Sequence, residues 1–167
     1  MTNRTAWIAG LGQGLGSWGT LINGSDLASL ANGSAVLSSV ADIANGTNLD
    51  MFMDISFKFT GLTSATPAAG SNVSFFLATL NQDGSSYGSG ELASGGTQTR
   101  APAMPLLGSY GIETAVAATS FTGTVTGLTI PPQSFRVALF NNSSFAFSAT
   151  AGNCVVTYKT YNLNLNS

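Results

Sequence analysis

The sequence predicts an all-β fold, an antiparallel β-sandwich or jelly roll of about eight strands with an extended Gly-rich N-terminal arm. Apolar and polar residues alternate with a period of two in several short segments. Signals for turns, made of Gly, Pro and Asn, recur about every ten residues, and no long amphipathic helix is evident. A length of 167 residues with 44% hydrophobic residues fits one domain with a substantial core.

Residues 1–33 are expected to form the N-terminal arm and a short helical turn, followed by a jelly-roll domain over residues 34–167. Glycines at alternate positions in 10–16 would keep the arm mobile until it docks. These glycines do not match a dinucleotide-binding loop, because the third one is out of register and no βαβ frame surrounds it. The arm carries apolar candidates for binding a partner: Trp7, Ile8, Leu11, Leu15 and Trp18. The alternative is that both tryptophans pack on the core of the domain itself.

The first strand of the domain is expected over residues 34–40, and the most regular one over residues 49–62. In the second of these, one face carries Met51, Met53, Ile55, Phe57 and Phe59. The opposite face carries polar residues, among which Asp50 and Asp54 are interpreted as solvated charges.

Residues 72–80 form a strand that is apolar on both faces, because Phe75 and Phe76 are adjacent. This pattern predicts a central position between two layers. Residues 85–99 are rich in Gly and Ser and are expected to be an exposed loop. Further strands are expected over residues 111–119, 121–130, 133–140, 145–150 and 154–163.

The supply of reactive side chains is small. The chain has no histidine, one cysteine, five basic and seven acidic residues. Without histidine, neither a Ser-His-Asp triad nor a Cys-His dyad exists. We therefore expect a protein that is not an enzyme and that uses no cofactor and no metal.

Candidate sites of other kinds are weak. Asp50 and Asp54 lie about 13 Å apart if both belong to one strand, which is too far for a glycosidase pair. The best candidate for a calcium loop surrounds Asn81, Asp83 and Glu91. Cys154 is expected to be a small buried hydrophobic residue.

Exposed aromatic rings are a second possible means of recognition, because they stack on the apolar faces of sugars. The candidates for such stacking are Tyr87, Tyr110, Tyr158 and Tyr161. For each of them, packing in the core or at an interface is the favoured alternative.

Composition also restricts the partners. Only 7% of the residues are charged, against about 25% in an average soluble domain. Such a surface of hydroxyls, amides and glycine repels copies of itself weakly, which favours a homo-oligomer or a larger assembly. No cluster of Lys and Arg is available to bind nucleic acid or an anionic membrane surface, and no apolar run is long enough to span a membrane.

Three segments carry a resemblance to a known family. They are residues 26–34 leading into 48–57, residues 73–80 with Asp83, Gly84 and Tyr87 behind them, and residues 130–143 closing with 157–161. In order and content they resemble small virion proteins of tailed bacteriophages, of the jelly-roll type that decorates or cements the capsid. The resemblance covers most of residues 25–162 and leaves the first 24 residues uncovered.

The resemblance implies a protein on the capsid surface of a virion, made in the cytoplasm of the host. It implies the major capsid protein as partner and a homo-oligomer, with a trimer favoured. No catalytic residues accompany such a family. The alternative function is a receptor- or carbohydrate-binding module of a phage fibre or tail.

Overall fold

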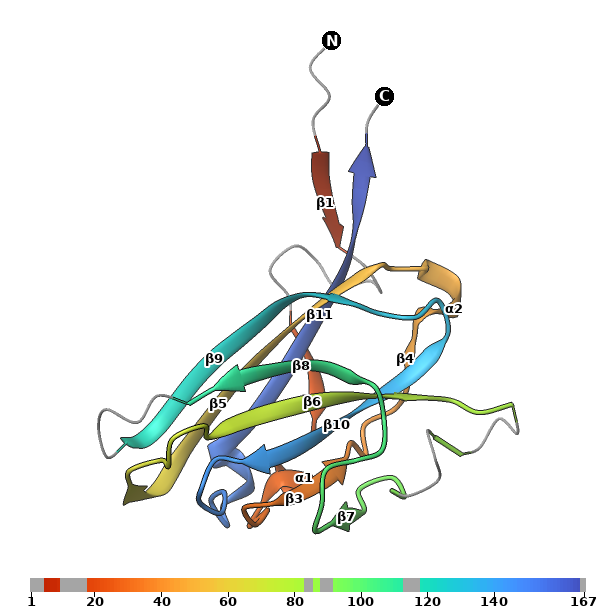
Figure 1. The fold of residues 1–167 in the computed structure, drawn as a ribbon. Helices are drawn as coiled ribbons and strands as arrows, with labels where there is room; N and C mark the ends of the chain where they lie inside the picture. The colour runs from red at the N-terminus through yellow and green to blue at the C-terminus, as the bar shows by residue number, and fades with distance from the viewer. Residues whose placement is uncertain (1–4, 10–17, 83–85, 88–91, 113–117, 166–167) are drawn as a thin grey trace.

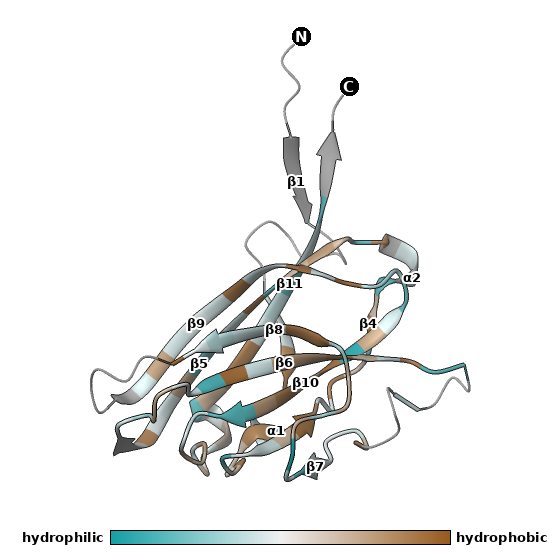
Figure 2. Cartoon of the chain, in the orientation of Figure 1, coloured by the Kyte–Doolittle hydropathy of each residue, from teal (hydrophilic) through white to brown (hydrophobic). Residues whose placement is uncertain are grey.

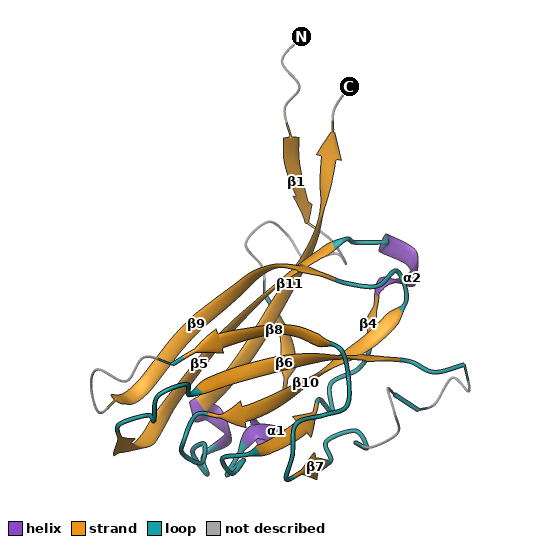
Figure 3. Cartoon of the chain, viewed as in Figure 1, coloured by secondary structure: helices purple, strands orange, loops and turns teal. Residues whose placement is uncertain are grey.

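The computed structural model describes residues 5–9, 18–82, 86–87, 92–112 and 118–165, and strands predominate among them (Figure 3). The strands, in chain order, are β1 (Thr5–Ala9), β2 (Gly19–Ile22), β3 (Ser34–Leu37), β4 (Ile43–Ala44), β5 (Phe52–Ala65), β6 (Asn72–Thr79), β7 (Thr97–Gln98), β8 (Leu106–Gly111), β9 (Ala118–Thr129), β10 (Ser134–Asn142) and β11 (Cys154–Leu165). The helical segments are α1 (Gly24–Leu27), α2 (Asn45–Asn48) and the 3-10 turn η1 (Ala151–Asn153).

The strands form two antiparallel sheets that pack face to face (Figure 1). In sheet A, β2 and β1 both pair with β11, which continues to β5 and then β9. In sheet B the order is β3-β10-β6-β8, with the short β7 beside β3 and β4 beside β10. Without β1, β4 and β7, each sheet has four strands, in the orders β2-β11-β5-β9 and β3-β10-β6-β8, which is the jelly-roll arrangement. The predicted all-β sandwich is confirmed, but β1, β2, β4, β7 and β8 were not among the eight strands expected from the sequence.

The core lies between the sheets and is built around β5. Met53, Ile55, Phe57 and Phe59 are buried there, as the alternation along residues 49–62 predicts. Met51 precedes β5 and is exposed, so the predicted face begins one alternation later than expected. The ring of Phe57 lies 5.3 Å from Phe59, 6.0 Å from Phe75 and 5.2 Å from Tyr110, measured between centroids.

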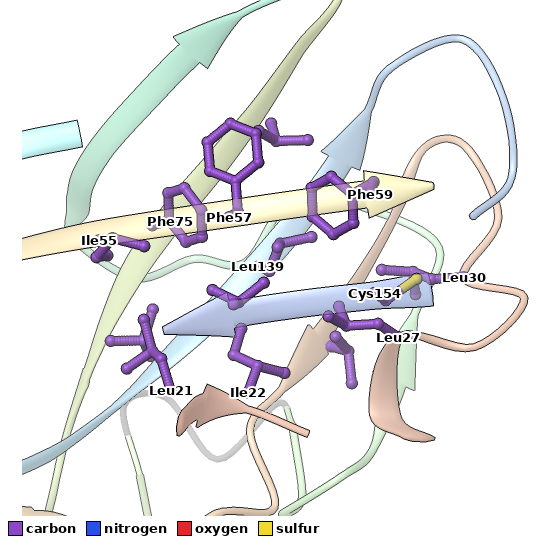
Figure 4. Close-up of a cluster of buried hydrophobic side chains, with 14 of the residues drawn as sticks. Leu21, Ile22, Leu27, Leu30, Ile55, Phe57, Phe59, Phe75, Leu139 and Cys154 are labelled. Carbon is purple, nitrogen blue, oxygen red and sulfur yellow. The ribbon is translucent and has the colours of Figure 1, made fainter. Parts of the chain in front are cut away.

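The later part of the predicted N-terminal segment 1–33 belongs to this core. Leu21 and Ile22 of β2 and Leu27 of α1 are buried, as is Leu30 beyond it (Figure 4). Figure 4 shows these side chains beside Cys154 and Leu139, which come from the last strands of the two sheets. The packed part of the chain therefore begins well before residue 34, because β2 and α1 fill one end of the sandwich.

Sheet B is covered on both faces. Phe75 of β6 enters the main core, whereas Phe76 packs against a second cluster on the outer face of the sheet. The buried members of this second cluster are Ala35, Leu37, Ala78, Leu92, Met104 and Ala138. The prediction of a two-sided strand over residues 72–80 is thus confirmed. The prediction of an exposed loop over residues 85–99 is wrong where Leu92 is buried and where β7 pairs with β3, while residues 88–91 lie outside the described part.

Two other strand predictions differ from the structure. Residues 145–150 form no strand, because Asn141 Nδ2 donates to the carbonyl of Phe145 at 2.9 Å and holds this segment as a turn. The strand expected over residues 111–119 falls mainly on residues outside the described part. Next to it the structure places β8, whose glycines concealed its strand pattern.

Candidate interaction surface at the protruding ribbon

The most prominent feature of the molecule is a two-stranded ribbon that leaves the sandwich. It consists of β1 and residues 161–165 of β11, and it projects beyond both sheets with the chain termini at its tip (Figure 1). Thr5 pairs with Leu165 and Ala9 pairs with Tyr161. Tyr161 is also the last residue of β11 that pairs with β5, through Phe52. Beyond it, the described residues contribute no third strand, and an isolated two-stranded ribbon is marginally stable in water.

The register gives the ribbon two unlike rows of positions. Residues directly opposite one another in an antiparallel pair share a face of the sheet. Trp7 is opposite Leu163, and Leu165 is opposite Thr5, so one row is mainly apolar. The alternate row pairs Ile8 with Asn162. An apolar row on a projecting ribbon is suited to contact with another protein.

Exposed apolar side chains also gather where the ribbon begins. Of the five large hydrophobic side chains exposed among the described residues, three are Trp18, Leu49 and Met51, which we call the ribbon base. Trp18 directly precedes β2 on one side of β11, and its ring lies 5.0 Å from Lys159 Nζ. On the other side, the Met51 amide donates to Asn162 Oδ1 at 2.8 Å. Leu49 and Met51 are each 54% exposed.

A buried carboxylate fixes β11 at the point where the ribbon leaves the sheet. Asp54 Oδ1 accepts hydrogen bonds from the Tyr161 hydroxyl at 2.8 Å and from the Gly127 amide at 2.9 Å. Lys159 Nζ lies 3.4 Å from Asp54 Oδ2. Burial, together with the hydrogen bond to Asp54 and its negative charge, raises the pKa of Tyr161 to about 12. These contacts hold three strands of sheet A together below the ribbon.

Asp50 is the second buried carboxylate in this region. Its Oδ1 accepts a hydrogen bond from Asn162 Nδ2 at 3.2 Å, and its Oδ2 has no hydrogen-bond partner within the described residues. The interpretation of Asp50 and Asp54 as solvated charges is wrong. Both are buried: Asp54 is bound by polar groups of β11 and β9, and Asp50 by Asn162 through one oxygen only, and a strand pattern alone does not reveal such partners.

The predicted binding residues fall into three groups. Trp7 and Ile8 lie in β1, and Trp18 lies at the ribbon base with its side chain 36% exposed. Leu11 and Leu15 lie outside the described residues. The strand predicted over residues 154–163 ends two residues short of Leu165, although the alternation Leu163-Asn164-Leu165 was a signal that it continues, and its pairing with β1 was not predicted.

The tyrosines proposed for stacking on sugars are all engaged within the protein. The Tyr87 hydroxyl donates to Asp42 Oδ1, and Tyr110 packs edge-on against Phe57. Tyr158 packs against the main core, and burial raises its pKa. Tyr161 is held by Asp54, so the four rings form no shared exposed platform.

A polar cluster on sheet B fastens the segment that covers its outer face. Arg136 Nε donates to Asp42 Oδ1 at 2.7 Å, and Arg136 NH1 donates to Ser94 Oγ at 2.5 Å. The guanidinium carbon lies 4.6 Å from the centroid of the Tyr87 ring. Burial raises the pKa of Asp42, but the hydrogen bonds from Tyr87 and Arg136 and the positive charge of Arg136 outweigh it, so the pKa is lowered overall. These contacts attach the covering segment to sheet B and have the features of a structural interaction.

Other candidate sites receive little support. Asp83 and Glu91 of the proposed calcium loop lie outside the described residues, and Asn81 donates to Ser86 Oγ at 2.9 Å. No group of three His, Cys, Asp or Glu side chains converges among the residues that the structure covers. Cys154 is buried as predicted, and burial raises the pKa of its thiol. None of the described helices is long and apolar enough to cross a membrane.

Comparison with known protein families, curated proteins and solved structures finds no match for this chain.

Proposed function

We propose that this protein is a virion structural protein that binds the outside of a phage capsid and stabilises contacts between major capsid subunits. The observation that carries the proposal is the ribbon, which projects from a rigid jelly roll and has Trp18, Leu49 and Met51 exposed at its base. Burial of apolar surface is the main driving force of most protein association. A projecting element with apolar residues reaches between neighbouring subunits more easily than a flat face does.

The chemistry of the rest of the molecule agrees with a structural role. Its two described ion pairs, Arg136–Asp42 and Lys159–Asp54, each serve to hold strands or loops together. The resemblance of the sequence to capsid cement proteins supports the same role and carries the expectation of a homotrimer on the capsid. The runner-up, a receptor- or carbohydrate-binding module, lacks the exposed tyrosine platform on which it depended.

The proposal is tested by rebinding of the purified protein to capsids from which it has been removed, followed by thermal release of the genome. We expect stoichiometric cosedimentation and a higher release temperature. A variant without residues 1–17 removes β1 but keeps Leu21 and Ile22 in the core, and it should bind at least about tenfold more weakly.

A point variant and a matched control separate binding from folding. Met51→Ser changes the ribbon base and should weaken rebinding, whereas Val155→Ser changes an exposed apolar residue of β11 that lies far along the strand and should not. Rebinding that is equal for all variants would contradict the role of the ribbon. A folded protein that stays in the supernatant would contradict capsid attachment and favour the fibre or glycan-binding alternative.

A further inference from the structure

The outer edge of β9 differs from the other margins of the two sheets. β9 is hydrogen-bonded to β5 on one side, and on the other side it has no backbone partner among the described residues. It is 12 residues long, whereas the other marginal strands β1, β2, β4, β7 and β8 have five, four, two, two and six residues. Unpaired N–H and C=O groups along such an edge are a template for pairing with another strand.

The sequence of β9 contains none of the residues that usually prevent such pairing. Residues 118–129 include no charged residue and no proline, and Figure 2 shows β9 without a strongly hydrophilic stretch. The register of β9 against β5 shifts at two places, and both shifts lie toward the ends of the paired segment. Between them, residues 120–125 pair in unbroken register with residues 55–60. Monomeric proteins normally protect an edge with Lys, Pro, bulges or short strands.

Glycine in the middle of β9 is explained by packing inside the same subunit. A Cβ at Gly123 would lie 2.5 Å from Phe57 Cζ and 2.8 Å from the Tyr110 ring. Gly123 is therefore required by the aromatic core and does not serve to disrupt the edge. A Cβ at Gly108 of the neighbouring β8 would lie 2.9 Å from Val125 Cγ1 and 2.9 Å from Leu128 Cδ2, so both sheets come together at this side of the sandwich.

The edge is also complementary to itself. In an antiparallel pair centred on Gly123, Thr122 is opposite Thr124 of the second copy, and Ser120 is opposite its Thr126. These hydroxyl side chains are exposed in the subunit and lie on the outer face of sheet A. On the inner face, Phe121 is opposite Val125 of the second copy, so the hydrophobic cores of the two copies become continuous. Threonine pairs and aromatic pairs with β-branched residues both stabilise adjacent strands.

The lack of charge on the β9 edge favours pairing with a second copy of this protein over pairing with a charged strand of another protein. The edge presents no charge that a charged partner strand would complement, and a net charge of −2 puts little repulsion between two copies. Leu106, 60% exposed on the adjacent β8, adds apolar surface at the same side of the molecule. An edge that pairs with its own copy produces an interface with two-fold symmetry, in which each contact occurs twice.

We propose that two copies of this protein associate through antiparallel pairing of their β9 edges, so that the two A sheets become one continuous sheet. This inference is independent of capsid attachment. It predicts an assembly built from two-fold pairs, in contrast to the trimer that the resemblance implies.

The test is sedimentation equilibrium of the wild type and of the double variant Thr122→Glu/Thr124→Glu over a concentration series. Thr122 is directly opposite Lys58 in β5, so a carboxylate there is compatible with the fold of one subunit. In the pair, however, carboxylates from the two copies face each other at both symmetric positions. We expect a dimer mass for the wild type and a dissociation constant raised at least about tenfold for the variant.

Two further samples make the test specific. Thr97→Glu/Thr99→Glu places the same charges at the same spacing on exposed residues at and beside β7, and it should keep the dimer. Mixing the Thr122→Glu/Thr124→Glu variant with Thr122→Lys/Thr124→Lys should restore a dimer with one copy of each, detected by native mass spectrometry. A wild type that remains monomeric or forms a trimer, or a β9 variant that dimerises like the wild type, would overturn the proposal.

Discussion

At the scale of single residues, buried polar side chains determine the geometry of the jelly roll. Asn45 is fully buried, and its amide joins the carbonyls of Asp50 and Pro131 at 2.8 and 2.7 Å. Asn141 plays the same part for Leu30 and Phe145. Composition predicted a surface rich in amides, but two of these amides are internal, because each satisfies backbone groups that are far apart in the sequence. No local pattern identifies such residues.

Tyr161 provides a prediction at this scale. Because its folded pKa of about 12 exceeds the ordinary tyrosine value of 10.0, the neutral hydroxyl contributes stability that is complete below pH 10.0 and is lost as the pH rises through about 12. Tyr161→Phe should remove the absorbance change of a tyrosine ionising near pH 12 and lower stability at neutral pH by about 1–2 kcal/mol.

Alkaline titration followed by tyrosinate absorbance checks this prediction, with Asp54→Asn as a second variant. Removing the charge of Asp54 should bring the ionisation of Tyr161 closer to the ordinary value. If Tyr161→Phe instead removes a tyrosine ionisation near pH 10, this hydroxyl ionises at its ordinary value in the folded protein.

At the scale of elements, the sequence predicted regular strands well and irregular ones poorly. The alternation in residues 49–62 identified β5 because one of its faces is apolar and buried in the core, while the other carries mainly polar residues. β8 and β1 were missed since glycines interrupt β8, and β1 becomes a strand only by pairing with β11. The candidate site was predicted in part for the same reason. The N-terminal apolar residues stood out, while their partners Leu163 and Leu165 are adjacent only in the fold.

The outer cluster on sheet B leads to a prediction for one segment. Leu92 is 4% exposed and holds the segment that follows β6 against sheet B. Leu92→Ala should cost about 2–3 kcal/mol by leaving a cavity, and it should loosen this segment before the sandwich unfolds. Hydrogen exchange should therefore increase in residues 92–105 and remain low in β5. Leu106→Ala, a matched change at an exposed leucine, should leave exchange in both regions unchanged.

At the scale of the whole molecule, the two sheets share one core to which β2 and β11, far apart in the sequence, both contribute. β11 lies between β5 and the N-terminal strands, so it has neighbours on both sides. Cys154 and Val156 of this strand are buried beside Ile22 and Leu27. The molecule therefore has no separable N-terminal part beyond the ribbon, and it should unfold as one unit.

Two truncated variants test whether the molecule unfolds as one unit. Removing residues 154–167 takes away a central strand and should leave an unfolded chain with no cooperative thermal transition. Removing only residues 163–167 shortens the ribbon and should preserve the transition within a few degrees. Circular dichroism during heating distinguishes these outcomes. A cooperative transition in the longer truncation would mean that sheet B and the rest of sheet A fold without β11.

The central place of β11 also constrains how the protein is made. β2 ends at Ile22 and its partner β11 begins at Cys154, so translation produces β2 on the order of ten seconds before the strand with which it pairs. During that time Leu21 and Ile22 have no sheet to join. In the nascent chain these two side chains must avoid contacts with other exposed apolar segments. Chaperones that bind such segments therefore have a long opportunity to bind at β2.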